Sequence, residues 1–333
     1  MITAKDLDYH NKATIDPTYA ETYFLIFSVP EESISGNAYL LVRPNVGAIL
    51  SSVYVHKGVC LNAWEADYAD APMHLKAPDK LSDFTLANGM SLSGSNNARD
   101  YHFRYEGREK LCSFDLNVKG IMQPFDALDP NQNPMLDKFA NTEEALGAGD
   151  GWAQGHYDTI GHITGELSLY GKTYKVDCVD GLDRSWGPRL EWNASPVSWM
   201  HMTFGTDLAF HLVMTLDVSK SGVRYTTFRF GYAAVNGEVT GVVSAEVVGS
   251  NAGMLGMSRI VRIRDAKGRE WEMFGAAVAA APWHSAYGSF TSFQTLYRWT
   301  MGDRVGHSSV TDVVGITTLG KRLSKLGSES KAG

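Results

Sequence analysis

The sequence predicts an all-β protein built as barrels or sandwiches, on three observations. Turn residues are dense along the 333 residues of the chain. Runs of β-branched and aromatic residues lie between the turns, and several of them alternate polar and apolar side chains as a half-buried strand does. Helical periodicity is scarce, so we expect only a few short helices.

The predicted strands follow one another as hairpins. Two runs rich in β-branched and aromatic residues come first, at 38–46 and 49–59. Further hairpins are expected where a glycine or an Asn-Gly pair separates two alternating runs. Their turns lie at Gly107, at Gly171, at Asn236-Gly237 and at 265–268.

Residues 126–151 are rich in Pro, Asn and Gly and contain few β-branched residues, as is typical of a linker. We therefore expect two tandem β-domains, at 1–150 and 151–320, followed by a flexible basic tail at 321–333. A chain of 333 residues is long enough for two domains, and its hydrophobic content of 44% supports a core in each.

Composition excludes several classes of partner. The formal charge of −7 and the isoelectric point near 5.8 argue against nucleic acid and anionic lipid, because both require a basic face.

The N-terminus has no leader pattern, and no window approaches the roughly 18 apolar residues that span a bilayer. Three widely spaced cysteines imply neither a disulfide framework nor a zinc knuckle. We expect a cytoplasmic protein without stable membrane insertion, and exposed strand edges leave a homodimer open.

The segment 152–192 gathers many of the reactive side chains. It contains histidines, carboxylates, arginines and tryptophans beside strand-like runs. Its most distinctive part is the run Asp183-Arg184-Ser185-Trp186-Gly187-Pro188-Arg189. Such a cluster is typical of a ligand or reaction site.

Asp183 is the first candidate for catalysis, and two interpretations of it stay open. If it pairs with Arg184 or Arg189, it belongs to a structural ion pair that closes the end of a strand. If it is desolvated instead, its pKa rises and it can hold a proton near neutral pH, as a general acid must.

His156 is the second candidate, because it and Asp158 face the same way in a strand while Tyr157 faces the opposite side. A histidine beside a carboxylate suits a proton relay, although a structural hydrogen-bonding role is commoner. His201 and His211 each project from otherwise apolar strands, and together with His156 they could supply three metal ligands. No tight spacing such as His-x-His supports a metal site, so we expect none.

Large aromatic side chains accompany these groups. They could line an apolar cavity and stabilise a carbocation, or they could simply fill a β-core. Glu65, in an aromatic and acidic cluster of the first domain, is a secondary acid–base candidate, with a solvated loop as the alternative. The predicted substrate-binding residues are Trp186, Trp152, Tyr157, Trp199, His201 and Arg184.

Several chemistries find no support in the motifs. The sequence contains no Gly-x-Gly-x-x-Gly opening a helix, no Walker-type phosphate loop and no Gly-x-Ser-x-Gly elbow. Nucleotide-dependent chemistry and serine hydrolysis are therefore not expected, and we expect no cofactor.

Three motifs resemble the pattern of proteins related to carotenoid 1,2-hydratase (hydroxyneurosporene synthase): Gly155-His156-Tyr157-Asp158, Gly161-x-x-x-Gly165 and the run 183–189. This lipocalin-like superfamily has two tandem β-domains and also holds kievitone hydratase-type enzymes and pericyclase-type cyclases. The specific match covers the segment 152–192, and the two-domain layout extends the resemblance over the chain.

The resemblance implies a cofactor-independent lyase or isomerase that hydrates, dehydrates or cyclises an apolar alkene, such as a terpenoid or steroid-like compound, by protonating it. Asp183 would be the proton donor, His156 would position or relay the proton, and Trp186 would shape the cationic intermediate. The alternative is a lipocalin-like carrier that binds an apolar small molecule without reacting with it. In a carrier the tryptophans matter and Asp183 does not.

Overall fold

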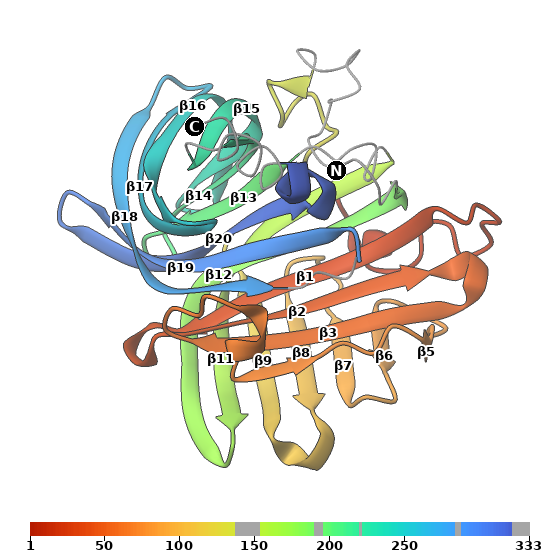
Figure 1. Ribbon diagram of the computed structural model, residues 1–333. Helices are drawn as coiled ribbons and strands as arrows, with labels where there is room; N and C mark the ends of the chain where they lie inside the picture. The colour runs from red at the N-terminus through yellow and green to blue at the C-terminus, as the bar shows by residue number, and fades with distance from the viewer. Residues whose placement is uncertain (137–153, 190–195, 220–221, 284–287, 322–333) are drawn as a thin grey trace.

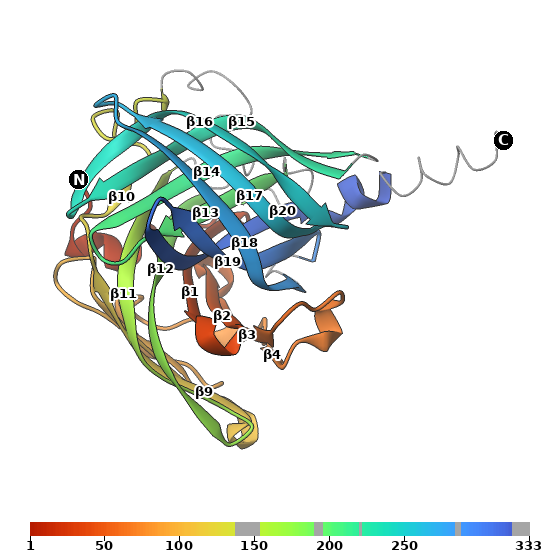
Figure 2. The ribbon, with the colours of Figure 1, turned by 90° about the vertical axis from the view of Figure 1, so that its left-hand side faces the viewer.

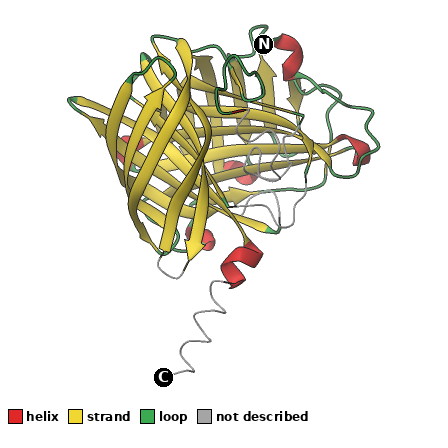
Figure 3. Ribbon diagram, turned by 90° about the horizontal axis from the view of Figure 1, so that it is seen from above, coloured by secondary structure: helices red, strands yellow, loops and turns green. Residues whose placement is uncertain are grey.

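The computed structural model describes residues 1–136, 154–189, 196–219, 222–283 and 288–321. Within these residues the chain forms a 12-stranded open sheet and a closed barrel, which confirms the predicted all-β class. Figure 3 shows how little helix accompanies the strands. The short 3-10 helices are η1 (Ala4–Leu7), η2 (Pro30–Glu32), η3 (Pro44–Val46), η4 (Ala63–Glu65) and η5 (Arg108–Lys110), and a helical turn follows at 316–321.

The open sheet curls into a half-barrel (Figures 1 and 2). Its strands are β1 (Tyr19–Val29), β2 (Ile34–Arg43), β3 (Ala48–Lys57), β4 (Tyr68–Asp70), β5 (Leu75–Lys76), β6 (Asp83–Thr85), β7 (Met90–Gly94), β8 (Tyr101–Glu106), β9 (Cys112–Gly120), β10 (Phe125–Asp126), β11 (Gly155–Leu169) and β12 (Lys172–Pro188). Their order is β4-β3-β2-β1-β12-β11-β9-β8-β7-β6, with β10 on β11 and β5 on β3.

The barrel follows the simplest antiparallel path, in which each strand pairs with the next and the last returns to the first. Its strands are β13 (Val197–Thr203), β14 (Leu208–Ser219), β15 (Gly222–Val235), β16 (Glu238–Ala252), β17 (Leu255–Asp265), β18 (Glu270–Trp283), β19 (Phe290–Met301) and β20 (Arg304–Gly315). The turns predicted at Gly171, at Asn236-Gly237 and at 265–268 all join adjacent strands.

The change from sheet to barrel falls between β12 and β13. The hairpin of β11 and β12 therefore belongs to the sheet of the N-terminal strands, where β12 pairs with β1 and β11 pairs with β9. The predicted domain boundary at residues 150 and 151 precedes this hairpin and lies outside the described residues, as does the predicted tail from residue 322 onward. No helix among the described residues has the length and apolar character needed to cross a membrane.

One face of the sheet packs against the outer wall of the barrel, with β12 on β13 and β20 and with β2 and β3 on β18. Thr203 of β13 donates a hydrogen bond to the carbonyl of Val179 in β12 (2.9 Å). Farther along, the Asn37 side chain donates to Gln294 Oε1 of β19 (2.7 Å). The two halves thus meet along a seam that polar side chains help to hold together.

The alternation of side chains along β14 shows which residues face this seam. Phe210 packs edge-to-face against Trp271 of β18, with ring centroids 5.0 Å apart. Since β14 and β18 are not neighbours in the barrel, Phe210 points into the barrel interior. His211 is the next residue and therefore points outward, toward the sheet. His201, its direct partner on β13, points the same way.

Candidate functional site

The register of β11 and β12 places two carboxylates opposite each other. Asp158 pairs with Asp183, and His156 pairs with Ser185, so these four residues share one face of the sheet. That face is the one turned toward the barrel, because His211 of β14 reaches Asp158. The predicted candidates Asp183 and His156 are thereby brought together, and the prediction that His156 and Asp158 face the same way is confirmed.

The opposite face of the same strands carries a separate cluster. Arg184 is fully buried and forms an ion pair with Glu21 of β1 (2.9 Å), and its Nε donates to the carbonyl of Asp6 (2.6 Å). Tyr157 contacts Trp186 edge-to-face on this side. A pair between Asp183 and Arg184 is therefore the wrong interpretation, because adjacent residues of a strand point to opposite faces.

Trp186 lies in that second cluster as well. Its ring stacks on His10 with centroids 3.5 Å apart and planes inclined by only 7°. The guanidinium of Arg184 lies 5.9 Å from its centroid. Trp186, Tyr157 and Arg184 thus pack together within the half-barrel, away from the face that carries Asp183.

The barrel contributes two histidines to the seam. The rings of His201 and His211 lie 4.8 Å apart between centroids. His201 Nδ1 lies 3.3 Å from Asp180 Oδ1. The ring of His201 rests on Gly181, where a Cβ atom would lie only 2.6 Å from Nδ1. A glycine is therefore needed at this position for the barrel to approach β12 so closely.

Two histidines hold Asp158 in its ionised form. His156 Nε2 lies 3.0 Å and His211 Nδ1 3.4 Å from Asp158 Oδ2. Burial alone would raise the pKa of Asp158, but the charges and hydrogen bonds of these histidines outweigh it and hold the pKa far below its ordinary value. Burial alone would lower the pKa of His156, and Asp158 reverses the effect, so that the pKa is raised. The pKa of His211 is lowered, chiefly by burial.

Asp183 has the opposite electrostatic environment. Burial and, to a smaller extent, the Asp158 carboxylate raise the pKa of its carboxyl, His156, His201 and Arg189 oppose the shift, and the resulting pKa is about 7. Two carboxyl groups on facing positions thus differ in protonation near neutral pH. A pair of this kind separates a proton donor from an ionised partner.

An aromatic wall adjoins Asp183. Phe24 is its direct neighbour on β1 and is buried. Its ring stacks on Trp283 of β18, with centroids 5.6 Å apart and planes inclined by 1°. Tyr39 contacts both rings edge-to-face. The acid therefore lies beside apolar surface that the sheet and the barrel provide jointly.

The remaining predicted residues lie elsewhere. Glu65 is exposed and accepts hydrogen bonds from the Asn62 side chain (2.9 Å) and from the backbone of Asn62 (3.2 Å) and Leu61 (2.6 Å). These contacts lower its pKa, and those with Asn62 form the capping box of η4. Trp199 lies on β13 two residues before His201 and is partly buried. Trp152 lies outside the described residues.

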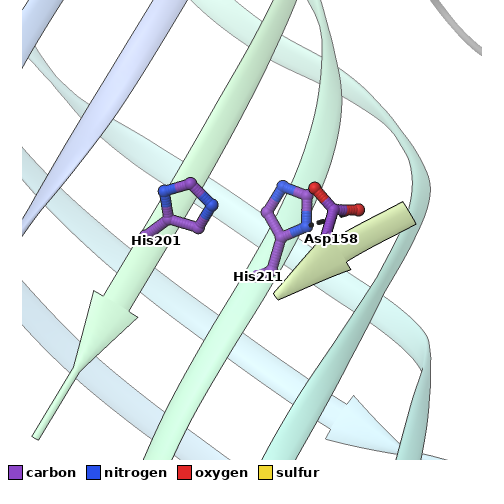
Figure 4. Close-up of side chains that lie close together, drawn as sticks. All are labelled: Asp158, His201 and His211. Atoms are coloured by element: carbon purple, nitrogen blue, oxygen red, sulfur yellow. Dashed lines mark ion pairs between the residues drawn. The ribbon is translucent and has the colours of Figure 1, made fainter. Parts of the chain in front are cut away.

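The sequence offered His201 and His211 together with His156 as possible metal ligands, whereas the structure groups the two barrel histidines with Asp158. Asp158, His201 and His211 offer ligand atoms that all lie within 4.8 Å of one another (Figure 4). The sequence spacing gave no sign of this set, because it arises from three strands of two different sheets. The signal present in the sequence was the alternation of His201 and His211 with apolar residues, which placed each on one face of a strand.

Comparison with known proteins places the chain in a family. The profile described as "Domain of unknown function (DUF7064)" matches residues 3–310, so the chain belongs to this family. A search of the curated proteins finds no match.

Solved structures share the fold at low sequence identity. The crystal structure of CghA is 11% identical, with a TM-score of 0.55, over 90% of this chain and 88% of CghA. Kievitone hydratase from Nectria haematococca is 10% identical, with a TM-score of 0.54, over 96% of this chain and 94% of that enzyme. At these identities the comparisons show a shared fold, and kievitone hydratase is one of the enzyme types that the predicted resemblance includes.

Proposed function

We propose that this member of the DUF7064 family is a lyase or isomerase of the hydratase, dehydratase or cyclase type, which protonates an apolar unsaturated small molecule with Asp183. The observation that carries the proposal is the position of Asp183, opposite the ionised Asp158 and beside Phe24, whose ring stacks on Trp283. Kievitone hydratase, which shares the fold, bears the name of such a reaction. A terpenoid or steroid-like alkene would suit the aromatic wall.

In a hydration, the Asp183 carboxyl transfers its proton to one carbon of the double bond, and the π electrons form the new C–H bond. The other carbon becomes a carbocation, which the faces of aromatic rings stabilise. A water oxygen then bonds to the cation, and the proton that this water loses returns to Asp183.

The test compares the chain with its Asp183→Asn variant in D2O. Alkenes that bind are first found by quenching of tryptophan fluorescence, and their deuterium content is then followed by mass spectrometry. Loss of a general acid lowers turnover by roughly 100- to 10,000-fold, so deuterium uptake should nearly vanish in the variant. Asp177→Asn, an exposed carboxylate of the same strand, is the matched control. Equal uptake in Asp183→Asn and the parent chain would refute the role.

The same experiment addresses the second candidate function, a carrier of an apolar molecule. The aromatic wall of Phe24, Tyr39 and Trp283 favours it, because such surface binds a ligand whether or not chemistry follows. A carrier would quench fluorescence equally in the parent chain and in Asp183→Asn, and neither protein would place deuterium on carbon.

A further inference from the structure

The seam between sheet and barrel contains a set of side chains with metal-ligand geometry. Asp158 comes from β11, His201 from β13 and His211 from β14, and their ligand atoms lie within 4.8 Å of one another. All three side chains are buried, with at most 3% of each exposed. Figure 4 shows the two imidazole rings side by side, with the carboxylate of Asp158 next to His211.

The fold fixes the three groups rigidly. His201 and His211 are direct partners in the β13–β14 ladder, so their outward direction and separation follow from the register. Asp158 lies in a strand that is paired on both sides, with β12 and with β10. Ligands held by strands in this way are positioned before an ion arrives, which favours binding.

Atoms of this set lack hydrogen-bond partners among the described residues. They are Asp158 Oδ1 and both ring nitrogens of His201 and His211. The two Nδ1 atoms still lie 3.3 and 3.4 Å from carboxylate oxygens, so the other three atoms are the ones available to an ion. A buried polar atom without a partner lowers the free energy of unfolding by about 1–3 kcal/mol, so three such atoms in one place destabilise the fold considerably. A cation that accepts lone pairs from the carboxylate and the imidazoles would remove that cost.

Side chains around the three proposed ligands would form an outer shell that orients them. Asp158 Oδ2 is already bound by His156 (3.0 Å), which leaves Oδ1 for an ion. His201 Nδ1 faces Asp180 (3.3 Å), which leaves its Nε2. A carboxylate behind a ligating histidine fixes the orientation of the ring and raises its basicity, and most histidine metal sites have such a partner.

The donor types select the class of ion. Two imidazoles and one carboxylate suit divalent transition metals, whereas Ca²⁺ and Mg²⁺ prefer all-oxygen sites. Three protein ligands leave at least one coordination position for water or another molecule. We propose that Asp158, His201 and His211 bind a divalent transition-metal ion of the Zn²⁺ or Fe²⁺ type. Asp183 is not one of the ligands, so metal binding and the acid chemistry proposed above are tested separately.

The experiment uses the full chain, stripped with a chelator and titrated with Co²⁺. Calorimetry is expected to give one site per chain, and visible absorption is expected to show the bands of Co²⁺ with nitrogen ligands. His211→Gln and Asp158→Asn should each weaken binding by more than about 100-fold, since loss of an outer-shell partner alone costs 10- to 100-fold. Asp180→Asn should fall within that smaller range. His162→Gln, an exposed histidine of β11 paired with Asp177, is the control and should bind as the parent chain does.

Binding should also be visible without any variant, because an ion that binds only the folded chain raises its melting temperature. This measurement keeps the proposal testable if a ligand variant fails to fold. A parent chain that takes up no stoichiometric Co²⁺ and melts at an unchanged temperature would overturn the proposal. So would folded His211→Gln and Asp158→Asn variants with undiminished affinity.

Discussion

Replacing Gly181 with alanine tests how closely the barrel and the sheet meet at the site. The added Cβ would lie 2.6 Å from His201 Nδ1, and nearer still to Cε1 and Nε2 of the same ring. Carbon and nitrogen atoms in contact prefer about 3.5 Å, so the ring must move by roughly 1 Å or more. His201 cannot move freely, because its ring lies against His211 and it is 3% exposed.

Overpacking of this kind costs about 1–3 kcal/mol. Gly181→Ala should therefore lower the free energy of unfolding by about that amount, measured by urea denaturation at constant slope. Gly288→Ala is the matched control, because nothing lies within 4 Å of its Cβ position. Neither glycine has a positive φ, so strain of the backbone does not enter the comparison.

The displaced ring should also bind Co²⁺ more weakly, and Asp183, whose environment includes His201, should react more slowly. A Gly181→Ala variant with the denaturation midpoint of the parent chain would refute the packing described for the seam. It would mean that the two halves of the protein stand farther apart than the contact between Gly181 and His201 requires.

Three further predictions concern single side chains. Arg184→Met should destabilise the fold by up to about 3–5 kcal/mol in urea denaturation, because it removes the guanidinium that pairs with the buried Glu21 and leaves His10 as the remaining basic neighbour of that carboxylate; a neutral effect would contradict the ion pair. Burial lowers the pKa of His56 to about 4 from 6.5, so the unfolded chain binds the extra proton as pH falls. Between pH 7 and 5 the parent should lose about 2 kcal/mol more stability than His56→Gln, whereas the exposed His74→Gln should follow the parent. An equal loss of stability in His56→Gln would contradict the lowered pKa of His56. Trp283→Leu removes the stack on Phe24 and should raise the KM of an apolar substrate by roughly 2- to 12-fold with little change in kcat; an unchanged KM would exclude this wall from binding.

Local patterns in the sequence predicted much of the fold, because turns are encoded by the residues that form them. The pair Asn236-Gly237 joins β15 to β16, and Gly171 joins β11 to β12, as expected. The pairing of β12 with β1 was not predictable in this way. It joins residues 19–25 to residues 182–188, and no local pattern names a partner so distant in the chain.

The candidate site likewise has a part that local sequence patterns predict and a part that they do not. The alternation of a strand correctly predicted that His156 and Asp158 share a face. The same rule excludes a pair between Asp183 and Arg184, because neighbours in a strand point to opposite sides. The proximity of His201 to Asp180 depends on the docking of the barrel onto the sheet, which the sequence pattern does not specify.

The chain buries charged and polar groups in several places, and the barrel and the seam differ in how such groups are paired. Inside the barrel, Arg259 donates to the hydroxyl of Tyr225 (2.8 Å), which in turn donates to Asp312 (3.1 Å), so the charges are linked by hydrogen bonds. In the seam, His201 and His211 leave ring nitrogens without partners among the described residues. Apolar side chains in their place would be neutral or stabilising, as for other buried charges. Unpaired polar atoms between the sheet and the barrel therefore lower the stability of the fold. Such local losses of stability are typical of functional sites, and here they accompany side chains that are already arranged to bind a proton or an ion.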